Sequence, residues 1–432
     1  MALIDVFRAA LLPLRGDWCY RKNKGPIHEN EISLPCDANT KPFKKMHWTI
    51  NLAGGPKRVN HAAVSVGQAL YSFGGYCTDE DYAIQRPIDV HVLNPVTYRW
   101  KVLNFDVDSA IPFQRYGHTV VSYGTYVYLW GGRNDENACK TLFRFDTKSH
   151  TWSRPNVTGS IPGARDGHSA VIIRNKMFIF GGYEEEIGLF SQDVYALDLN
   201  SLTWSMMPTF GLPPSFRDFH TATVYLDRYM FVFGGRGDRH GPFHTRNEMY
   251  CNTLVCLDVE RQEWIRPKTH GDIPQGRRSH SAFMHNSFMY VFGGYNGCNN
   301  QHLNDFYRYD PESGEWKSLK PCGQSPGPRR RQGCVVIDNR VFFFGGTSPP
   351  LPLQNRSPPT EDEQNNDVNE EANLVDHDDM YVLDMEPSLK TLCMLCVLKH
   401  RLDTSNVPRV LQQELGWMRL PNRMSVSPLS SG

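Results

Sequence analysis

A double glycine recurs six times along the chain, and this repeat constrains the fold more than any other feature. Each pair closes an aromatic-rich apolar run such as YSFGGY, FIFGGY or FFFGGT, and the second glycines fall at positions 75, 132, 182, 235, 294 and 346. The period is therefore about 50 residues. Repeats of this length are supersecondary units that bury their apolar faces against neighbouring copies, so the sequence predicts a repeat architecture.

Two further motifs keep the same register. A segment with arginine or histidine precedes each glycine pair, as in RYGHTVV and RDGHSAV, and a tryptophan follows five of the pairs: Trp100, Trp152, Trp204, Trp264 and Trp316. The sixth tryptophan, Trp48, lies before the first repeat, in a stretch that matches the joint between two later repeats. We therefore expect an N-terminal strand around Trp48 to complete the last repeat and to close the array into a ring without exposed sheet edges.

The pattern resembles the kelch family over roughly residues 46–385. The resemblance implies an all-β fold, a six-bladed kelch β-propeller closed by an N-terminal strand and followed by a small α-helical C-terminal segment. Such propellers are binding scaffolds, so we expect a protein that is not an enzyme. The enzymatic alternative, a copper oxidase built on a propeller, needs a cluster of Tyr, His and modified Cys that nothing in the sequence marks.

The motifs also divide the chain. We expect residues 1–45 to be an uncertain or disordered extension without a counterpart in the repeat, 46–386 to form the propeller, 387–417 to be helical and 418–432 to be a disordered tail. Residues 347–376 are rich in proline and then acidic, which predicts a disordered insert in the last blade.

Composition narrows the partners. The formal net charge is zero, which makes a nucleic-acid partner unlikely on charge grounds. The 11 cysteines lack framework spacing and no convincing secretory signal precedes them, so we expect reduced thiols in a cytoplasmic and nuclear protein. No run of 18 or more apolar residues is present, which predicts no membrane span.

Histidines recur at one position of the repeat and raise the question of a metal site. Packing and hydrogen bonding between blades explain them more simply, because one histidine per blade does not converge on one ion. The Cys393-x-x-Cys396 pair lacks a second pair of ligands. We therefore expect neither a metal nor a cofactor. The recurring histidines are His61, His118, His168, His220 and His280.

Topology places the ligand-binding face. Strands one and two of a blade form a hairpin, so the loops that lead into strand one and out of strand two lie at the same end, which we call the mouth. Arginine guanidinium groups there suit a carboxylate or a phosphate. The first arginine of each repeat, as in Arg115, Arg165 and Arg217, could instead be structural. The candidate ligand residues are Arg133, Asp166, Tyr183, Asp218, Arg236, Arg239, Arg278, Ser279 and Arg331.

Two of these candidates are acidic. Asp166 and Asp218 could contact a basic residue of the same ligand, or they could form ion pairs with nearby arginines.

A helical pattern follows the last predicted strand. Ser388 can cap a helix with an apolar face. The spacing resembles the BC box by which receptors bind Elongin C, read here as Leu389, Cys393 and Val397, followed by a cullin-2 box read as Val407, Pro408, Leu411 and Leu415. A cullin-5 box would need a proline at position 410, where this chain has valine. The alternative is a pair of helices that merely pack under the propeller.

The combination resembles the kelch substrate receptors of cullin-2 ubiquitin ligases. The resemblance implies capture of substrate proteins with a C-terminal glycine, whose carboxylate is held by arginines and a serine, for proteasomal degradation. The matching positions are Arg236, Arg239 and the pair Arg278-Ser279. The implied partners are Elongin B/C, cullin-2 and its RING subunit. The alternative function is a non-ligase kelch scaffold or chromatin-associated interaction protein. The chain itself ends in Gly432, which suggests self-association through that residue.

Overall fold

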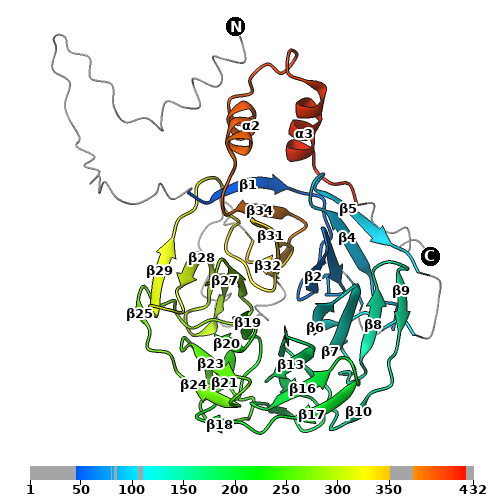
Figure 1. Cartoon of the computed structure of the whole chain (residues 1–432), viewed down its shortest axis with the longest axis vertical. Coiled ribbons are helices and arrows are strands. Elements are labelled where there is room, and N and C mark those ends of the chain that lie inside the picture. The colour runs from blue at the N-terminus through cyan, green and yellow to red at the C-terminus, as the bar shows by residue number, and fades with distance from the viewer. Residues whose placement is uncertain (1–44, 79, 82–84, 106–109, 351–372, 425–432) are drawn as a thin grey trace, which may run out of the picture.

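Six sheets stand around a central channel, and each is one blade of a propeller (Figure 1). The computed structural model describes residues 45–78, 80–81, 85–105, 110–350 and 373–424. The innermost strands of neighbouring blades contact one another all the way round the ring, including those of the first and last blades. The predicted all-β, six-bladed kelch propeller with a small C-terminal helical segment is therefore confirmed.

Blades I to VI follow the chain, and the strands of each are given from the channel outward. Blade I holds β2 (Ala62–Val66), β3 (Ala69–Phe73), β4 (Val90–Asn94) and β5 (Arg99–Leu103); blade II holds β6 (Tyr116–Tyr123), β7 (Tyr126–Arg133), β8 (Phe143–Asp146) and β9 (Thr151–Ser153); blade III holds β12 (Ser169–Ile173), β13 (Lys176–Phe180), β16 (Val194–Asp198) and β17 (Thr203–Met206).

The remaining blades have the same order. Blade IV holds β19 (Thr221–Tyr225), β20 (Tyr229–Phe233), β23 (Val255–Asp258) and β24 (Glu263–Ile265); blade V holds β26 (Ser281–His285), β27 (Phe288–Asn296), β28 (Gln301–Tyr309) and β29 (Glu315–Leu319); blade VI holds β30 (Gly333–Ile337), β31 (Arg340–Phe344), β34 (Met380–Asp384) and β1 (His47–Leu52).

The second strand of each blade is the most deeply buried. In β31 the residues Val341 to Phe344 are all at most 1% exposed. Both faces of this strand lie against neighbouring blades, which explains why it is a continuous apolar run rather than an alternating one. The glycine pair follows because this strand ends where the chain must turn at the mouth.

Strand β1 closes the ring. It pairs antiparallel with β34, from His47 opposite Asp384 to Leu52 opposite Met380. Trp48 is 4% exposed and its ring centre lies 5.4 Å from that of Phe343. The chain therefore joins its first strand to its last blade, as the displaced sixth tryptophan predicts.

Short strands from the linkers extend three blades outward. β10 (Thr158–Gly159), β18 (Phe210–Gly211) and β25 (His270–Gly271) pair in parallel with the outer strands of blades III, IV and V.

At the mouth, β11 (Arg165–Asp166) pairs with the hairpin of β14 (Tyr183–Glu184) and β15 (Leu189–Phe190), β21 (Arg236–Asp238) pairs with β22 (Glu248–Tyr250), and a 3-10 turn η1 spans Gly297–Asn299.

The ends of the predicted insert are ordered, which corrects the expected boundaries. β32 (Thr347–Ser348) pairs with β33 (Val375–Asp376), and Thr78 of blade I donates a 2.7 Å backbone hydrogen bond to the Asp376 carboxylate. The β32–β33 pairing forms the stem of the insert, and the bond from Thr78 to the Asp376 side chain holds it against blade I. The interior of the predicted insert, 351–372, lies outside the described residues, as do 1–44 and the predicted self-association residue Gly432.

Two helices follow β34 and project from the edge of the ring (Figure 1). They are α2 (Leu389–Lys399) and α3 (Arg409–Arg419). Helix α3 extends past the predicted boundary at 417, and beyond it Met418, Asn422 and Met424 pack on the propeller, so this part of the chain does not belong to a disordered tail. Among the described residues, no helix is long and apolar enough to cross a membrane.

Candidate ligand-binding mouth

A belt of buried arginines supports the mouth from below. Each uses its Nη1 to donate to the carbonyl of the first glycine of the pair in its own blade, at 2.8 to 3.2 Å. Arg277 is 0% exposed and also bonds Asp305, at 2.5 and 2.9 Å. These first arginines of the repeat therefore hold the strand ends, which agrees with the structural alternative. The belt arginines are Arg115, Arg165, Arg217, Arg277 and Arg329.

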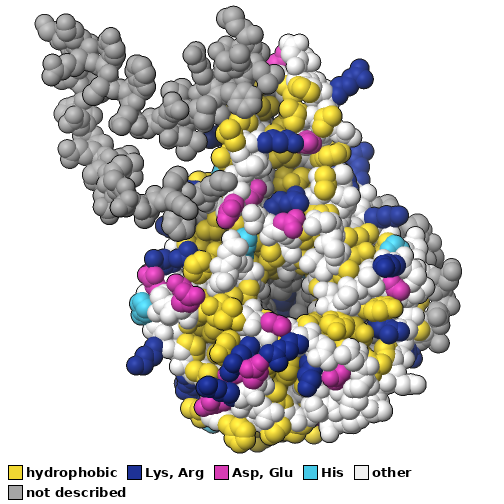
Figure 2. All heavy atoms as spheres, in the orientation of Figure 1, with side chains coloured by type: hydrophobic (Ala, Val, Ile, Leu, Met, Phe, Trp, Pro, Cys, Tyr) yellow, Lys and Arg dark blue, Asp and Glu magenta, His cyan; other side chains and the backbone are white. Residues whose placement is uncertain are grey.

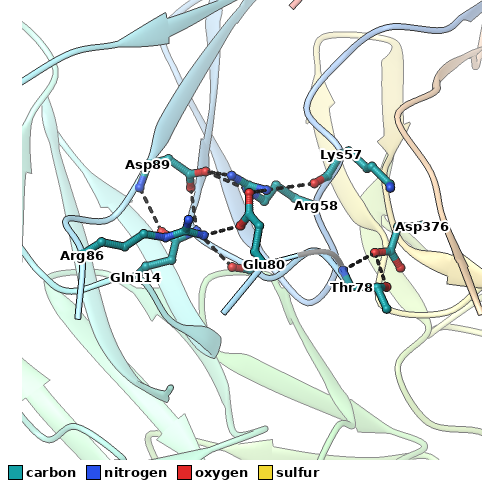
Figure 3. A network of polar contacts seen from close by, with 9 residues as sticks. Lys57, Arg58, Thr78, Glu80, Arg86, Asp89, Gln114 and Asp376 are labelled. Atoms are coloured by element: carbon teal, nitrogen blue, oxygen red, sulfur yellow. Dashed lines mark hydrogen bonds and ion pairs between the residues drawn. The ribbon is translucent and has the colours of Figure 1, made fainter. Parts of the chain in front are cut away.

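In blade I the corresponding arginine, Arg58, belongs to a wider polar network (Figure 3). Its Nε donates to Asp89 at 2.6 Å, and Nη1 reaches Glu80 at 3.2 Å. Gln114 of the next blade donates to the same Asp89 at 3.1 Å. The network joins the ends of blades I and II beneath the mouth.

The recurring histidines connect neighbouring blades. The Nε2 atoms of His168, His220 and His280 lie 2.7 to 2.8 Å from a Ser or Thr hydroxyl of the preceding blade. Their rings cover the first glycine of that blade: a Cβ on Gly131 would lie 2.4 Å from Cε1 of His168. The described residues contain no group of three or more potential ligands that could hold a metal ion.

Burial keeps these histidines neutral. It lowers the pKa of His118 and of His61 to about 3, and it lowers the pKa values of the other three well below the usual range. Gln332 occupies the sixth position, where its Nε2 donates to Ser281 at 3.0 Å. A neutral amide thus replaces a neutral imidazole in blade VI.

The residue before each of these six positions forms a closed ring of backbone hydrogen bonds. Each N–H donates to the carbonyl of the equivalent residue in the preceding blade, at 2.7 to 3.1 Å, and Asn60 closes the circle with Arg331. All six residues have left-handed φ values between 48° and 67°. The ring surrounds a cavity of about 140 Å³ at the floor of the mouth, and Figure 2 shows the hollow at the centre of the disc. The six residues are Asn60, Gly117, Gly167, Phe219, Ser279 and Arg331.

Arg278 and Ser279 carry unpaired polar atoms at this floor. Arg278 is 8% exposed, and its Nε is buried without a hydrogen-bond partner in the described part of the chain. The buried Oγ of the half-buried Ser279 is in the same condition. Unsatisfied buried donors are costly, so adjacent ones at the floor of an open mouth point to a ligand with acceptor oxygens.

Further cations surround these two residues. The guanidinium carbons of Arg278 and Arg330 lie 5.5 and 4.5 Å from the ring centre of Tyr295. Arg331 donates to the Tyr76 hydroxyl at 2.6 Å. Burial, with the neighbouring arginines, lowers the pKa of His302 to about 4. This side of the mouth, from blades V, VI and I, is therefore rich in positive charge while its histidine is neutral.

Arg236, from the neighbouring blade IV, is already paired. Its Nε donates to Asp218 at 3.1 Å and its Nη1 to Glu248 at 3.2 Å. Desolvation opposes the charged form of Arg236, but the coulombic attraction of these carboxylates outweighs it and raises its pKa. Glu248 also accepts from the Tyr250 hydroxyl at 2.5 Å. Asp218 thus follows the ion-pair alternative within the chain.

The other candidates are more dispersed. Asp166 is 7% exposed and forms no side-chain hydrogen bond within the described ranges, and burial together with Asp218 raises its pKa to about 7. Arg133 forms a 3.2 Å ion pair with Glu185. Tyr183 packs on Phe190, with ring centres 5.5 Å apart. Arg239 is exposed in the loop after β21.

Sequence reasoning omitted several residues that shape the site. Glu248 and Tyr250 lie on β22, in a 2–3 loop that departs from the repeat, and His302 is the second residue of the long β28 of blade V. None has an equivalent in other blades, so periodicity gave no signal for them. A pocket of about 440 Å³ beside the mouth is lined by Glu248, Tyr250 and Cys298, among others.

The predicted adaptor motifs lie on the two projecting helices. Ser388 caps α2 by accepting from the Thr391 N–H at 3.0 Å. Leu389 is 46% exposed, Cys393 and Val397 are half-buried, and hydrophobic side chains gather over this part of the molecule in Figure 2. An apolar helix left this open is suited to binding a partner.

The second predicted motif is partly buried. Pro408 precedes α3 and is exposed, Val407 and Leu411 are half-buried, and Leu415 is 5% exposed. Leu415 therefore contributes to packing in the chain itself. The other three remain accessible.

The fold and the repeating glycine, arginine and histidine positions define a kelch-type propeller. A family model described as KLHDC2/KLHL20/DRC7 Kelch-repeats domain matches residues 60–240 and 117–346, and the chain belongs to this kelch-repeat family. It is similar to Kelch domain-containing protein 3 from Bos taurus, with 46% identity over 393 residues, 89% of this chain and 99% of that protein.

Two other relatives are similar to this chain over different lengths. Kelch domain-containing protein 3 from Homo sapiens is 46% identical over 394 residues, 89% of this chain and 99% of that protein. Host cell factor from Drosophila melanogaster is 30% identical over 272 residues, 59% of this chain and 18% of that protein. Kelch-repeat propellers are in general non-enzymatic interaction scaffolds, and the predicted kelch family is confirmed.

Proposed function

We propose that this protein is the substrate-recognition subunit of a cullin-2–Elongin B/C ubiquitin ligase and acts in the cytoplasm and nucleus. The mouth binds the C-terminal glycine of substrate proteins, and the helices recruit Elongin B/C, cullin-2 and its RING subunit. Ubiquitin transfer and proteasomal degradation then depend on those partners, so the chain itself is not catalytic and needs no cofactor.

The observation that carries the proposal is the pair of buried, unpaired donors on Arg278 and Ser279. A terminal carboxylate offers two acceptor oxygens that match a guanidinium and a hydroxyl. Arg330 and Arg331 add positive charge around it, and the narrow floor favours a terminal residue without a side chain. We assign Arg236 and Asp218 a supporting role, because their charges are already matched.

The helices support the adaptor half of the proposal. Leu389 and Val397 present apolar surface beside the half-buried Cys393, in the arrangement of a helix that binds in a partner's groove. The alternative of a non-ligase scaffold or chromatin-associated protein would leave this surface without a role.

The test is co-purification. A variant with Leu389→Asp and Pro408→Ala should lose Elongin B/C and cullin-2, because charge replaces an exposed apolar contact and the second motif loses its proline. Leu402→Asp is the matched control, since Leu402 is also exposed, at 38%, and lies between the motifs. Undiminished recovery of both partners with the double variant would favour the scaffold alternative.

A further inference from the structure

The outer edges of the blades show how the helical segment is attached. In blade III the short strand β10 pairs in parallel with β17, and Thr158 stands opposite Thr203. The Thr158 N–H donates to the Leu202 carbonyl at 3.1 Å. In this parallel register the backbone of Thr158 bonds both neighbours of Thr203: its N–H donates to the Leu202 carbonyl, and its carbonyl faces the Trp204 N–H. Blades IV and V repeat the arrangement at Trp264 and Trp316.

In blade I a side chain takes the place of that strand. The residues equivalent to Leu202 and Trp204 are Tyr98 and Trp100. The Trp100 N–H donates to Oδ1 of Asn422 at 3.0 Å, and Nδ2 of Asn422 donates to the Tyr98 carbonyl at 3.0 Å. The carboxamide therefore supplies one acceptor and one donor, as a peptide group does. Asn422 lies beyond α3, more than 300 residues along the chain.

The backbone around Asn422 binds the joint between blades VI and I, which we call the seam. The Asn422 N–H donates to the Ala53 carbonyl at 2.8 Å, and Met424 N–H to Gly54 at 3.3 Å. The approach is so close that a Cβ on Gly54 would lie 1.9 Å from the Asn422 carbonyl oxygen. The other side of this linker is held by blade VI, where Gly55 N–H donates to Asp378 at 2.8 Å.

The helices thus stand on both sides of the seam. Helix α2 rises from β34 of blade VI, and the chain after α3 descends beside β5 of blade I (Figure 1). Lys390 and Glu414 connect the helices through a 2.8 Å hydrogen bond. Met418 and Met424 pack against the apolar cluster shared by blades VI and I. A segment held at both ends has little freedom to change direction.

We propose that Asn422 is a positioning residue that locks the helical segment across the seam, so that the segment is a rigid arm with one direction relative to the mouth. In the ligase this direction would fix where a bound substrate lies relative to the ubiquitin-transfer machinery. That last consequence rests on the proposed function, whereas the rigid arm does not.

The primary test measures the direction of the arm in the full chain. Spin labels introduced as unnatural amino acids at Gln413 on α3 and at Glu312 of blade V, both exposed, give a distance distribution. We expect one narrow distance distribution for the labelled chain that keeps Asn422, and a broader one for the labelled Asn422→Ala variant. The control is Arg423→Ala, which removes an exposed neighbour and should leave the distribution unchanged. An equally narrow distribution with Asn422→Ala would overturn the proposal.

A second variant and a second measurement keep the proposal testable if Asn422→Ala does not fold. Gly54→Ala disturbs the same contact from the propeller side, and it should also broaden the distribution. Hydrogen exchange at the Trp100 amide should become about tenfold faster in Asn422→Ala, because its acceptor is gone. Unchanged Trp100 exchange would contradict the assigned bond.

The ubiquitin assay separates the two proposals. With Asn422→Ala, peptide binding and Elongin recovery should persist while ubiquitination of a bound substrate falls. If the distribution broadens but the unmodified chain supports no ubiquitination at all, the proposed function fails and the rigid arm stands.

Discussion

Arg277 and Arg278 are adjacent in the sequence, yet they belong to two different regions of the molecule. Arg277 lies in the belt, where Asp305 and the Gly293 carbonyl satisfy it. Arg278 lies at the mouth, where its buried Nε has no partner among the described residues. Both are buried, so burial alone does not distinguish structure from function. For these two side chains, the difference is whether the described residues supply the acceptors.

The belt and the mouth also differ in how strictly their residues repeat from blade to blade. Belt positions recur in blade after blade because every blade must end its second strand and contact its neighbour. Mouth positions differ between blades: the residues of the hydrogen-bonded ring include two glycines, a phenylalanine, a serine and an arginine. A shared backbone frame thus carries an asymmetric set of side chains, as a binding surface requires.

The largest expected effect is on stability, from Arg277→Ala. Removing this side chain leaves Asp305 unpaired and one buried carbonyl unsatisfied, which should cost about 3 kcal/mol of unfolding free energy. Arg278→Ala should cost far less, because the described part of the chain gives its guanidinium no carboxylate partner comparable to Asp305. Chemical denaturation of the two variants compares belt and mouth directly, and equal losses would remove the distinction between them.

A glycine pair of variants isolates the contact between blades. Gly124 and Gly131 have φ values of 63° and 72°, so alanine at either position should cost about 1 kcal/mol from the backbone alone. A Cβ on Gly124 meets open space, whereas one on Gly131 would lie 2.4 Å from Cε1 of His168 and 2.9 Å from the Arg165 carbonyl oxygen of the next blade. Gly131→Ala should therefore lower the unfolding free energy by about 2 kcal/mol more than Gly124→Ala, as measured by chemical denaturation. Similar losses would show that blade III can shift away from Gly131 at little cost, and would contradict a tight contact between these blades.

Ligand binding should be sensitive to the mouth in a graded way. Arg278→Ala should weaken binding of a peptide with a C-terminal glycine by at least about tenfold, since one charge-assisted hydrogen bond is lost. Ser279→Ala should weaken it less, because a neutral donor is lost. Isothermal titration gives both values. Full affinity in Arg278→Ala, with weak binding in Arg236→Ala instead, would move the site to the blade IV side.

The recurring histidines predict a propeller that is destabilised by acid. Because burial lowers the pKa of His118 to about 3, below its usual 6.5, the unfolded chain binds more protons between these values. The contribution of each such histidine to the unfolding free energy should be complete above about pH 6.5 and should fall by about 1.4 kcal/mol per pH unit as the pH drops. Blade VI has glutamine, Gln332, at this position. His118→Gln should therefore lower the slope of unfolding free energy against pH by about 1.4 kcal/mol per pH unit, the contribution of one proton. An unchanged slope would contradict the assignment.

The propeller was predictable because its determinants are local and periodic. The glycine pairs, the belt arginines and the displaced Trp48 each belong to a motif that recurs in the other blades. The mouth was predictable only as a set of loops. Arg236 has carboxylate partners in Asp218 and Glu248, whereas Arg278 Nε has no hydrogen-bond partner among the described residues. This difference is set by loop geometry rather than by the repeat.

Asn422 was beyond sequence reasoning for a related reason. Its side chain substitutes for a missing strand in a blade more than 300 residues away, and a single asparagine beyond a helix carries no periodic signal. The expected disordered tail was wrong there because these hydrogen bonds and the methionine contacts order the chain.

The most direct test of the carboxylate site uses one peptide in two forms. A peptide ending in glycine with a free carboxylate is compared with its C-terminal amide, on the unmodified chain and on Arg278→Ala. We expect the acid to bind the unmodified chain at least about tenfold more tightly than the amide, and this preference to disappear in Arg278→Ala. Equal affinity of the two peptides for the unmodified chain would contradict a mouth built to hold a terminal carboxylate.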